Sequence, residues 1–280
     1  MASNVKVICK RGNNVNEDYA FACEGFAYVI DGSSGITDFN VTGYESDAKW
    51  LSQGLGNALQ ERISNIKKGI PEIITEVIEA LHSQYTTYCT VASAKNEDLP
   101  SACLSVFRTS KDKLEYFQLG DCVSLIKFKN GEIKVLFDDA VPILDHKVVS
   151  HIKAESKRQS KPIIGVLKFG KEMLIENRKK KNMNGGYWIL DTTGVGISHA
   201  EVHTFDINDI SQFSIMSDGF AEIVDLYRIY TYDKLILTMA EHGLEALCKE
   251  LWDAQDSDPL MEKFPRLKHR DDASAVWCER

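Results

Sequence analysis

Three apolar, β-like runs in this chain each end beside an acidic residue that is paired with a glycine. The three pairs are Asp31-Gly32, Gly120-Asp121 and Asp218-Gly219. A carboxylate at the end of a buried strand is costly to desolvate unless a cation or hydrogen bonds compensate its charge. Three such acids in one domain predict a shared cation, and oxygen ligands without His or Cys favour Mg²⁺ or Mn²⁺ over zinc.

A single Asp-Gly pair has a simpler interpretation, because both residue types favour tight turns. Judged alone, Asp121 and Asp271 would both be assigned to turns. The histidines offer no better site, because His199 and His203 flank Ala-Glu-Val and lack the glutamate placement of a zinc protease helix. The metal hypothesis therefore depends on the acids being considered together.

The overall composition is that of a globular protein. The chain has 280 residues, of which 44% are hydrophobic, and a formal net charge of −8. This length allows a large core, and we expect a single domain over residues 1–280. Acids and bases are interspersed, which argues against a nucleic-acid partner. The densest basic run, residues 178–181, is typical of a solvated face, with a contact for an acidic or phosphorylated partner as the alternative.

The cysteines indicate a reducing compartment. There are seven, which is an odd number, and none forms a CxxC pair. Neither a zinc knuckle nor a disulfide framework is indicated, so we expect small buried thiols. The N-terminus lacks a secretory apolar core, and no apolar stretch approaches the ~20 residues that span a bilayer. We expect a cytoplasmic monomer with no membrane partner.

The acids must be positioned by a layered fold of strands and helices. Helices are predicted over residues 46–66, 71–88, 232–241 and 244–255, with two more helical segments within 140–184. Strands are predicted over 5–10, 19–23, 26–30, 101–109, 114–119, 123–128, 132–137, 187–190, 202–205, 213–217 and 273–278. The runs from 101 to 137 are spaced like an antiparallel meander, with an Asn130-Gly131 hairpin. This order predicts α+β layers and excludes a regular βα alternation.

Five short motifs together resemble a known family. In chain order they are Asn16-Glu17-Asp18, Val29 to Gly35, Leu119 to Cys122, Met216 to Gly219 and Asp271 to Val276. Each is weak alone, but their order and spacing resemble the metal-dependent serine/threonine phosphatases of the PP2C (PPM) family. The resemblance implies a four-layer αββα sandwich of two mostly antiparallel sheets flanked by helices. It also implies a flap-like insertion over about 140–184, where family members vary.

The resemblance assigns metal-binding roles position by position. Asp31 matches the acid that bridges two divalent ions, and the Gly32 carbonyl matches a ligand of one of them. Asp218 and Asp271 match the other carboxylate ligands of the first ion, with Asp272 as the alternative to Asp271. The remaining matches are Glu17 for the second ion, Asp18 as its neighbour, and Asp121, which with Asp218 holds a weaker third ion in some members.

Two positions depart from the family pattern. Asn13 stands where many members have an arginine that grips the substrate phosphate, and Asn cannot replace a guanidinium charge. Arg11 is the nearest substitute, and it would need a bulged strand end to reach the site. Ser33 replaces a histidine that follows the Asp-Gly pair in eukaryotic members, which indicates a bacterial-type enzyme.

The resemblance implies an enzyme that acts on phosphoproteins. We expect hydrolysis of phosphoserine or phosphothreonine by a water held between two Mg²⁺ or Mn²⁺ ions, with Asp31 and Asp218 central to catalysis. The alternative is a pseudophosphatase that uses the fold as a binding or regulatory module, a hypothesis that the missing arginine motivates. A third hypothesis is a metal-dependent hydrolase of another phosphoester.

Overall fold

The computed structural model describes residues 4–33, 35–37, 39–88 and 94–280. Within these residues the strands form two antiparallel sheets, ordered β1-β11-β10-β6-β7 and β2-β3-β4-β5-β9, with β8 beside β4. The strands are β1 (Asn4–Lys10), β2 (Tyr19–Cys23), β3 (Phe26–Ser33), β4 (Ser101–Ser110), β5 (Lys113–Leu119), β6 (Val123–Phe128), β7 (Ile133–Leu136), β8 (Leu190–Asp191), β9 (Glu201–Asp206), β10 (Ile210–Met216) and β11 (Ala273–Glu279). Ser34 and Cys89 lie outside the described residues.

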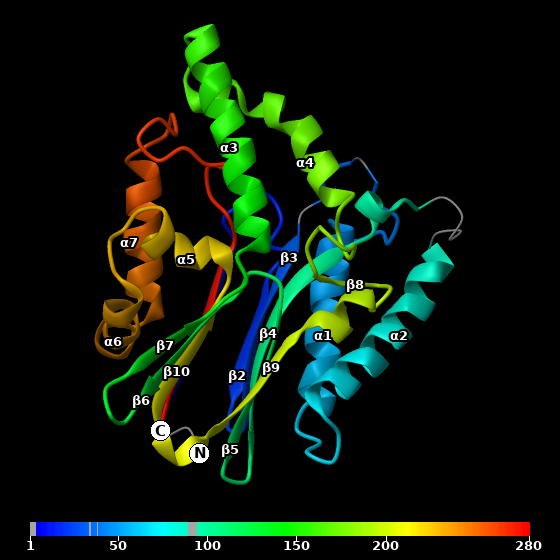
Figure 1. Cartoon of the computed structure of the whole chain (residues 1–280), viewed down its shortest axis with the longest axis vertical. Coiled ribbons are helices and arrows are strands. Elements are labelled where there is room, and N and C mark those ends of the chain that lie inside the picture. Colours follow the sequence, from blue (N-terminus) through cyan, green and yellow to red (C-terminus); the bar gives the residue numbers. More distant parts are fainter. Residues whose placement is uncertain (1–3, 34, 38, 89–93) are drawn as a thin grey trace.

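Helices cover the outer face of each sheet (Figure 1). They are α1 (Asp47–Arg62), α2 (Ile70–Tyr88), α3 (Ala140–Gln159), α4 (Lys171–Arg178), α5 (Asp218–Asp225), α6 (Tyr232–His242) and α7 (Leu244–Asp256). Side chains of α1 and α2 pack with β3 and β4, and side chains of α5, α6 and α7 pack with β10 and β11. A third core lies between the sheets, where the Phe107 and Phe213 rings are 4.9 Å apart. These four layers confirm the predicted αββα sandwich.

Two glycines in α1 show why a helix of low intrinsic propensity forms there. A Cβ on Gly56 would lie 2.5 Å from the Tyr19 ring, and one on Gly54 would lie 2.8 Å from a Leu81 methyl group. Glycine therefore allows α1 to approach both the sheet and α2 closely, at the cost of helix propensity. The Ser46 hydroxyl accepts a hydrogen bond from the Lys49 amide and caps the helix. The helix ends at Arg62, earlier than the predicted residue 66.

The predicted meander over residues 101–137 is wrong in its topology. Strands β4 and β5 pair in one sheet, whereas β6 and β7 pair in the other. The chain crosses between the sheets at Gly120. Its φ of +91° disfavours a side chain, and a Cβ there would lie 2.4 Å from Cys103 Sγ. The Asn130-Gly131 hairpin is present between β6 and β7. The crossover leaves Asp121 at the junction of the two layers.

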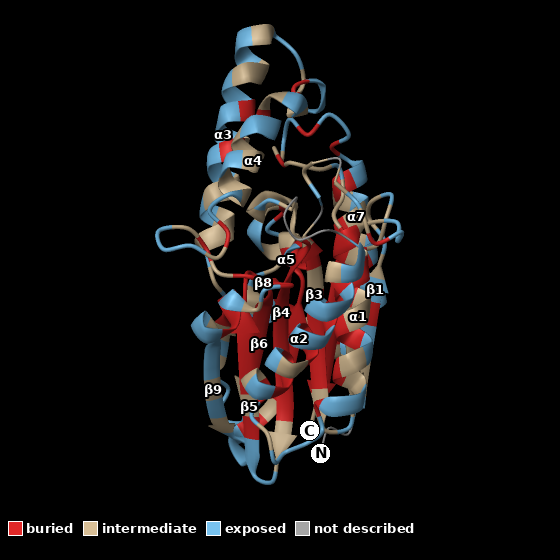
Figure 2. Cartoon of the chain, turned by 90° about the vertical axis from the view of Figure 1, so that its right-hand side faces the viewer, coloured by how far each residue is buried: buried red, intermediate tan, exposed pale blue. Residues whose placement is uncertain are grey.

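Three further elements differ from the sequence-based expectation. Helix α5 was not predicted, because its eight residues are too few for a clear helical repeat. The strand expected over 187–190 is reduced to β8, and the neighbouring Trp188 ring stacks on His199 with centroids 3.4 Å apart. Helices α3 and α4 extend beyond the ends of the sheets, and Figure 2 shows α3 far more exposed than the strands. None of the helices in the described residues has the length and apolar run that a bilayer crossing requires.

Candidate metal centre

The predicted acids converge at one end of the sandwich. Asp31 lies near the end of β3, and Asp218 is the first residue of α5. The Asp218 amide donates a hydrogen bond of 3.3 Å to Asp31 Oδ2, although 187 positions separate the two residues. The charges of Asp18 and Asp121 also act on Asp31. The acids therefore form one electrostatic cluster drawn from four separate segments.

The glycines that follow Asp31 and Asp218 serve close packing and not tight turns. Gly32 lies inside β3, where a Cβ would be 2.3 Å from the Glu17 carbonyl oxygen. Gly219 lies in the first turn of α5, where a Cβ would be 2.1 Å from the Asp272 carbonyl oxygen. Neither glycine has a positive φ. The absence of these side chains brings the segments that carry Glu17 and Asp272 against the central acids.

Burial and mutual repulsion hold the protons of these acids unusually tightly. Burial, followed by the charges of Asp218, Asp18 and Asp121, raises the pKa of Asp31 well above its ordinary value. Burial and the Asp218 charge raise the pKa of Asp121 to about 7. Asp218 itself reaches solvent, yet the surrounding protein and the Asp271 charge still raise its pKa. Such a cluster binds cations, because a cation removes the repulsion that the protons otherwise relieve.

The two neighbouring acids that precede β11 have different partners. Asp272 is buried, and its carboxylate accepts hydrogen bonds from the amides of Gly12 (2.9 Å), Asn13 (3.3 Å) and Glu17 (2.8 Å). Asp272 therefore fixes the N-terminal loop and has little capacity left for a metal. Asp271 instead accepts bonds of 2.9 and 2.8 Å from Lys268 Nζ, and one of 3.2 Å from Asn13 Nδ2. These contacts favour Asp271 over Asp272 as the ligand.

The donor set suits a hard divalent cation. Asp18 is buried, and its Oδ2 meets no hydrogen-bond partner among the described residues. Carboxylate oxygens of this kind are the ligands that Mg²⁺ and Mn²⁺ take in proteins. In the described part of the chain, no three His, Cys, Asp or Glu side chains are already grouped around one point.

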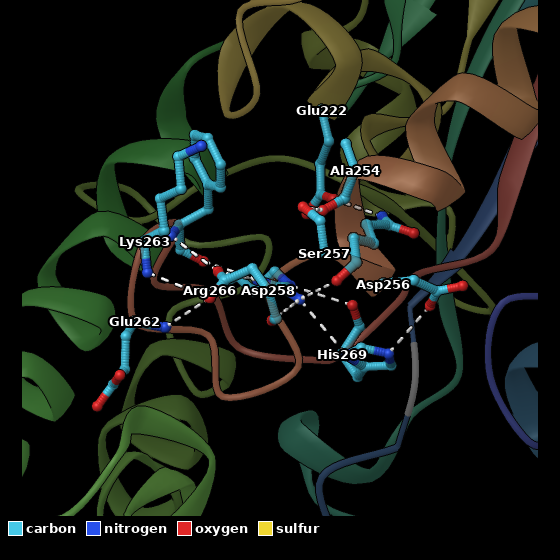
Figure 3. Close-up of polar contacts among 11 residues, drawn as sticks. Glu222, Ala254, Asp256, Ser257, Asp258, Glu262, Lys263, Arg266 and His269 are labelled. Atoms are coloured by element: carbon cyan, nitrogen blue, oxygen red, sulfur yellow. Dashed lines mark hydrogen bonds and ion pairs between the residues drawn. The ribbon is translucent and has the colours of Figure 1, made fainter.

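A buried ion pair holds the loop that carries Lys268 and Asp271. Figure 3 shows Arg266 beside Asp258, to which its Nη1 donates at 3.1 Å, while Nη2 donates to the Asp258 carbonyl at 3.1 Å. The Arg266 Nε group donates to the His269 carbonyl at 3.0 Å. Asp258 in turn accepts from the amides of residues 262, 263 and 264. This network sets the direction in which the loop enters the acidic cluster.

Motif reasoning missed two residues at this site. Asp145 lies on α3 and is half-buried, and burial followed by the Asp218 charge raises its pKa to about 6. Lys268 lies close enough for the charges of Asp271, Asp218 and Asp31 to raise its own pKa. Neither residue belongs to a recognisable motif, and only the folding of distant segments brings them here. Arg11 is exposed.

The basic run at the end of α4 is not one solvated face, so that interpretation is wrong. Lys181 is fully buried, and its ammonium donates to the Leu99 carbonyl at 2.8 Å and lies 3.9 Å from Asp191. Lys179 is exposed and pairs with Glu176. Arg178 donates to Ser101 Oγ at 3.2 Å and faces a cavity of about 410 Å³. Three of the four basic residues in this run therefore have three different surroundings.

Comparison with known proteins gives a family and a fold. A family model described as Protein phosphatase 2C matches residues 9–261. The serine/threonine phosphatase PstP/Ppp of Mycobacterium tuberculosis is 13% identical, with a TM-score of 0.57 over 100% of this chain and 99% of that chain. The catalytic domain of PstP in complex with two manganese ions is 15% identical, with a TM-score of 0.56 over 99% and 97% of the two chains. Stp1 from Staphylococcus aureus is 13% identical, with a TM-score of 0.58 over 100% and 95%. No curated protein sequence matches the chain.

Proposed function

Because this chain belongs to the protein phosphatase 2C family, we propose that it hydrolyses phosphoserine and phosphothreonine in proteins with Mg²⁺ or Mn²⁺. One observation carries the proposal. The carboxylates of Asp31, Asp121 and Asp218 come from separate elements, act electrostatically on one another, and have raised pKa values. A chain that folds at the cost of such repulsion gains from binding divalent cations.

The proposal assigns two ions to this cluster. Asp218 and Asp271 would hold the first ion, Asp31 would serve both ions, and the Gly32 carbonyl would bind one of them. Glu17 would support the second ion, with Asp18 beside it. Asp121 and Asp218 would hold a weaker third ion. Bound ions of this kind lower the pKa of water and stabilise charge on the attacking and leaving oxygens.

The protein itself contributes the positions of the acids. The bond from the Asp218 amide to Asp31 Oδ2 links the start of α5 to β3, and so fixes the distance between the two acids. Asp272 ties the Glu17 segment to the same point through the Glu17 amide. Ser33, which follows the Asp-Gly pair, lines the adjoining cavity and carries no group of suitable pKa to protonate a leaving alkoxide.

We propose further that residues of about 140–184 form the flap beside this site. Helices α3 and α4 extend past the sheets at the end where α5 begins (Figure 1). The charges of Asp218 and Asp271 act on Asp145 of α3, which places that helix next to the acidic cluster. A substrate that reaches the acids would then contact α3 and α4.

Metal-dependent turnover is the test of this function. Purified protein should hydrolyse p-nitrophenyl phosphate and phosphothreonine peptides in Mn²⁺, and EDTA should abolish the activity. Asp31→Asn should remove turnover, while Asp253→Asn, a change on the exposed face of α7, should leave it unchanged. Hydrolysis that persists in EDTA would refute the metal mechanism. Preference for small esters over every tested phosphopeptide would favour another phosphoester as substrate.

A second candidate function is a binding module without turnover. The pairing of Lys268 with both oxygens of Asp271 favours it, because an internal cation already neutralises one proposed ligand. The exposure of Arg11 adds to this, since no arginine of that segment reaches the site. A protein that binds Mn²⁺ by calorimetry but hydrolyses neither substrate class would support the module.

A further inference from the structure

A cavity of about 410 Å³ adjoins the acidic cluster and has an uneven distribution of charge. Its described lining includes two cationic side chains, Lys268 and Arg178. Five acids also belong to the described lining, Glu17, Glu45, Asp47, Glu97 and Asp98. Several of these have partners within the protein, and Glu45 pairs with Lys49. Asp47 accepts from the Val41 and Thr42 amides, and Asp98 accepts from Thr37 Oγ1 at 2.7 Å.

Lys268 brings positive charge to the boundary between the cavity and the proposed metal ligands. Its ammonium lies 2.8 Å from Asp271 Oδ2, and the side chain remains 39% exposed. The ammonium is therefore held by Asp271, while the side chain still lines the cavity. An ammonium group has three donors, so contact with Asp271 leaves capacity for an anionic ligand.

Arg178 approaches the same space from the flap. It is the last residue of α4, and one of its guanidinium nitrogens is bonded to Ser101 Oγ. Both Arg178 and Lys268 act on the carboxyl of Asp145, so the two cations face a common region although 90 positions separate them. A planar guanidinium binds two oxygens of a phosphate at once, whereas an ammonium acts as a point charge.

The N-terminal segment does not supply this cation. Asn13 lines the cavity, but its side-chain amide donates to Asp271 Oδ1. Arg11 is exposed and is absent from the described lining. An anionic substrate that enters the cavity therefore meets Lys268 and Arg178, and not Arg11.

We propose that Lys268 and Arg178 form the subsite that binds the phosphate group of the substrate. This inference rests on the proposed function and replaces the sequence-based assignment of Arg11. Lys268 holds the phosphate next to the acidic cluster, and Arg178 holds it from α4. The flap thereby becomes part of phosphate binding, in addition to contacting the rest of the substrate.

The first test separates substrate binding from turnover. Lys268→Gln and Arg178→Gln should each raise the KM for p-nitrophenyl phosphate and the inhibition constant of inorganic phosphate by roughly 10- to 100-fold, with a smaller effect on kcat. Measurements are made at saturating Mn²⁺, because Lys268 also contacts a proposed metal ligand. Lys268→Arg and Arg178→Lys should recover most of the affinity. Lys179→Gln is the matched control, and its KM should equal that of the unchanged protein.

The second test remains informative if the protein proves inactive. Calorimetry with inorganic phosphate in Mn²⁺ should show binding that the double variant Lys268→Gln/Arg178→Gln loses. If wild type binds phosphate and lacks turnover, the subsite stands and the proposed enzymatic function fails. If the double variant binds phosphate as tightly as wild type, or if Arg11→Gln alone abolishes binding, the subsite assignment is overturned.

Discussion

Asp121→Asn measures what it costs the metal-free protein to keep an ionised carboxylate that is buried and lies near the Asp218 charge. The side chain is only 7% exposed, and in the folded protein its pKa rises from 3.8 to about 7. At ~1.4 kcal/mol for each pKa unit, an ionised Asp121 costs the native state about 4 kcal/mol. A buried amide keeps part of the desolvation cost. We therefore expect Asp121→Asn to increase the free energy of unfolding by about 1–3 kcal/mol at pH 8 in EDTA.

The pH dependence fixes the sign of this effect. A carboxyl with a raised pKa in the folded state binds its proton more tightly there than in the unfolded chain. Its contribution to stability is present below the unfolded pKa and is lost as the pH rises towards the folded pKa of about 7. The advantage of Asp121→Asn should therefore be absent near pH 4 and complete by pH 8.

Urea unfolding followed by circular dichroism provides the assay. Curves are recorded at both pH values, in EDTA and in Mn²⁺, with Asp253→Asn as a control because Asp253 forms an exposed pair with Lys249. Saturating Mn²⁺ should reduce or reverse the gain in unfolding free energy that Asp121→Asn has over wild type, since Asn is a poorer ligand than a carboxylate. An Asp121→Asn protein no more stable than wild type at pH 8 in EDTA would refute the claim that burial and the Asp218 charge make an ionised Asp121 costly in the folded state.

Three further results should follow from the same geometry. Asp218→Asn should lower Mn²⁺-dependent turnover by at least ~10²-fold with the fold retained by circular dichroism, and unchanged turnover would remove Asp218 from the site. Lys268→Met should tighten Mn²⁺ binding by about 10-fold in calorimetry because it removes a cation from Asp271, whereas weaker or equal binding would show that Lys268 and the metal do not compete. Arg108→Met should lower the free energy of unfolding in urea by about 3 kcal/mol, because the buried guanidinium donates to Glu115 and to the Ile63 and Lys68 carbonyls. The kcat of the folded protein should not change. A large loss of kcat would contradict this purely structural role.

Local pattern determined much of this protein. The regular apolar spacing of 71–88 predicted α2, because helix periodicity is a property of neighbouring residues. The residue types at strand ends predict that Asp31 and Asp218 share a cation. The five ordered motifs indicate the family that the match over residues 9–261 establishes. Element boundaries shifted by a few residues, as at the C-terminal end of α1, which stops at Arg62 and not at the predicted residue 66.

Contacts between distant segments decided the rest. The crossover at Gly120 separates β5 from β6 and moves Asp121 to the junction of the sheets, which no local repeat encodes. Asp271 and Asp272 are adjacent and of the same residue type, yet tertiary packing gives them different partners. Asp271 binds Lys268, whereas Asp272 accepts hydrogen bonds from backbone amides of the N-terminal loop. The residue types show which metal ligands and charged groups the chain contains. Tertiary packing selects which charges share a site, because electrostatic coupling depends on distance in space and not on separation along the chain.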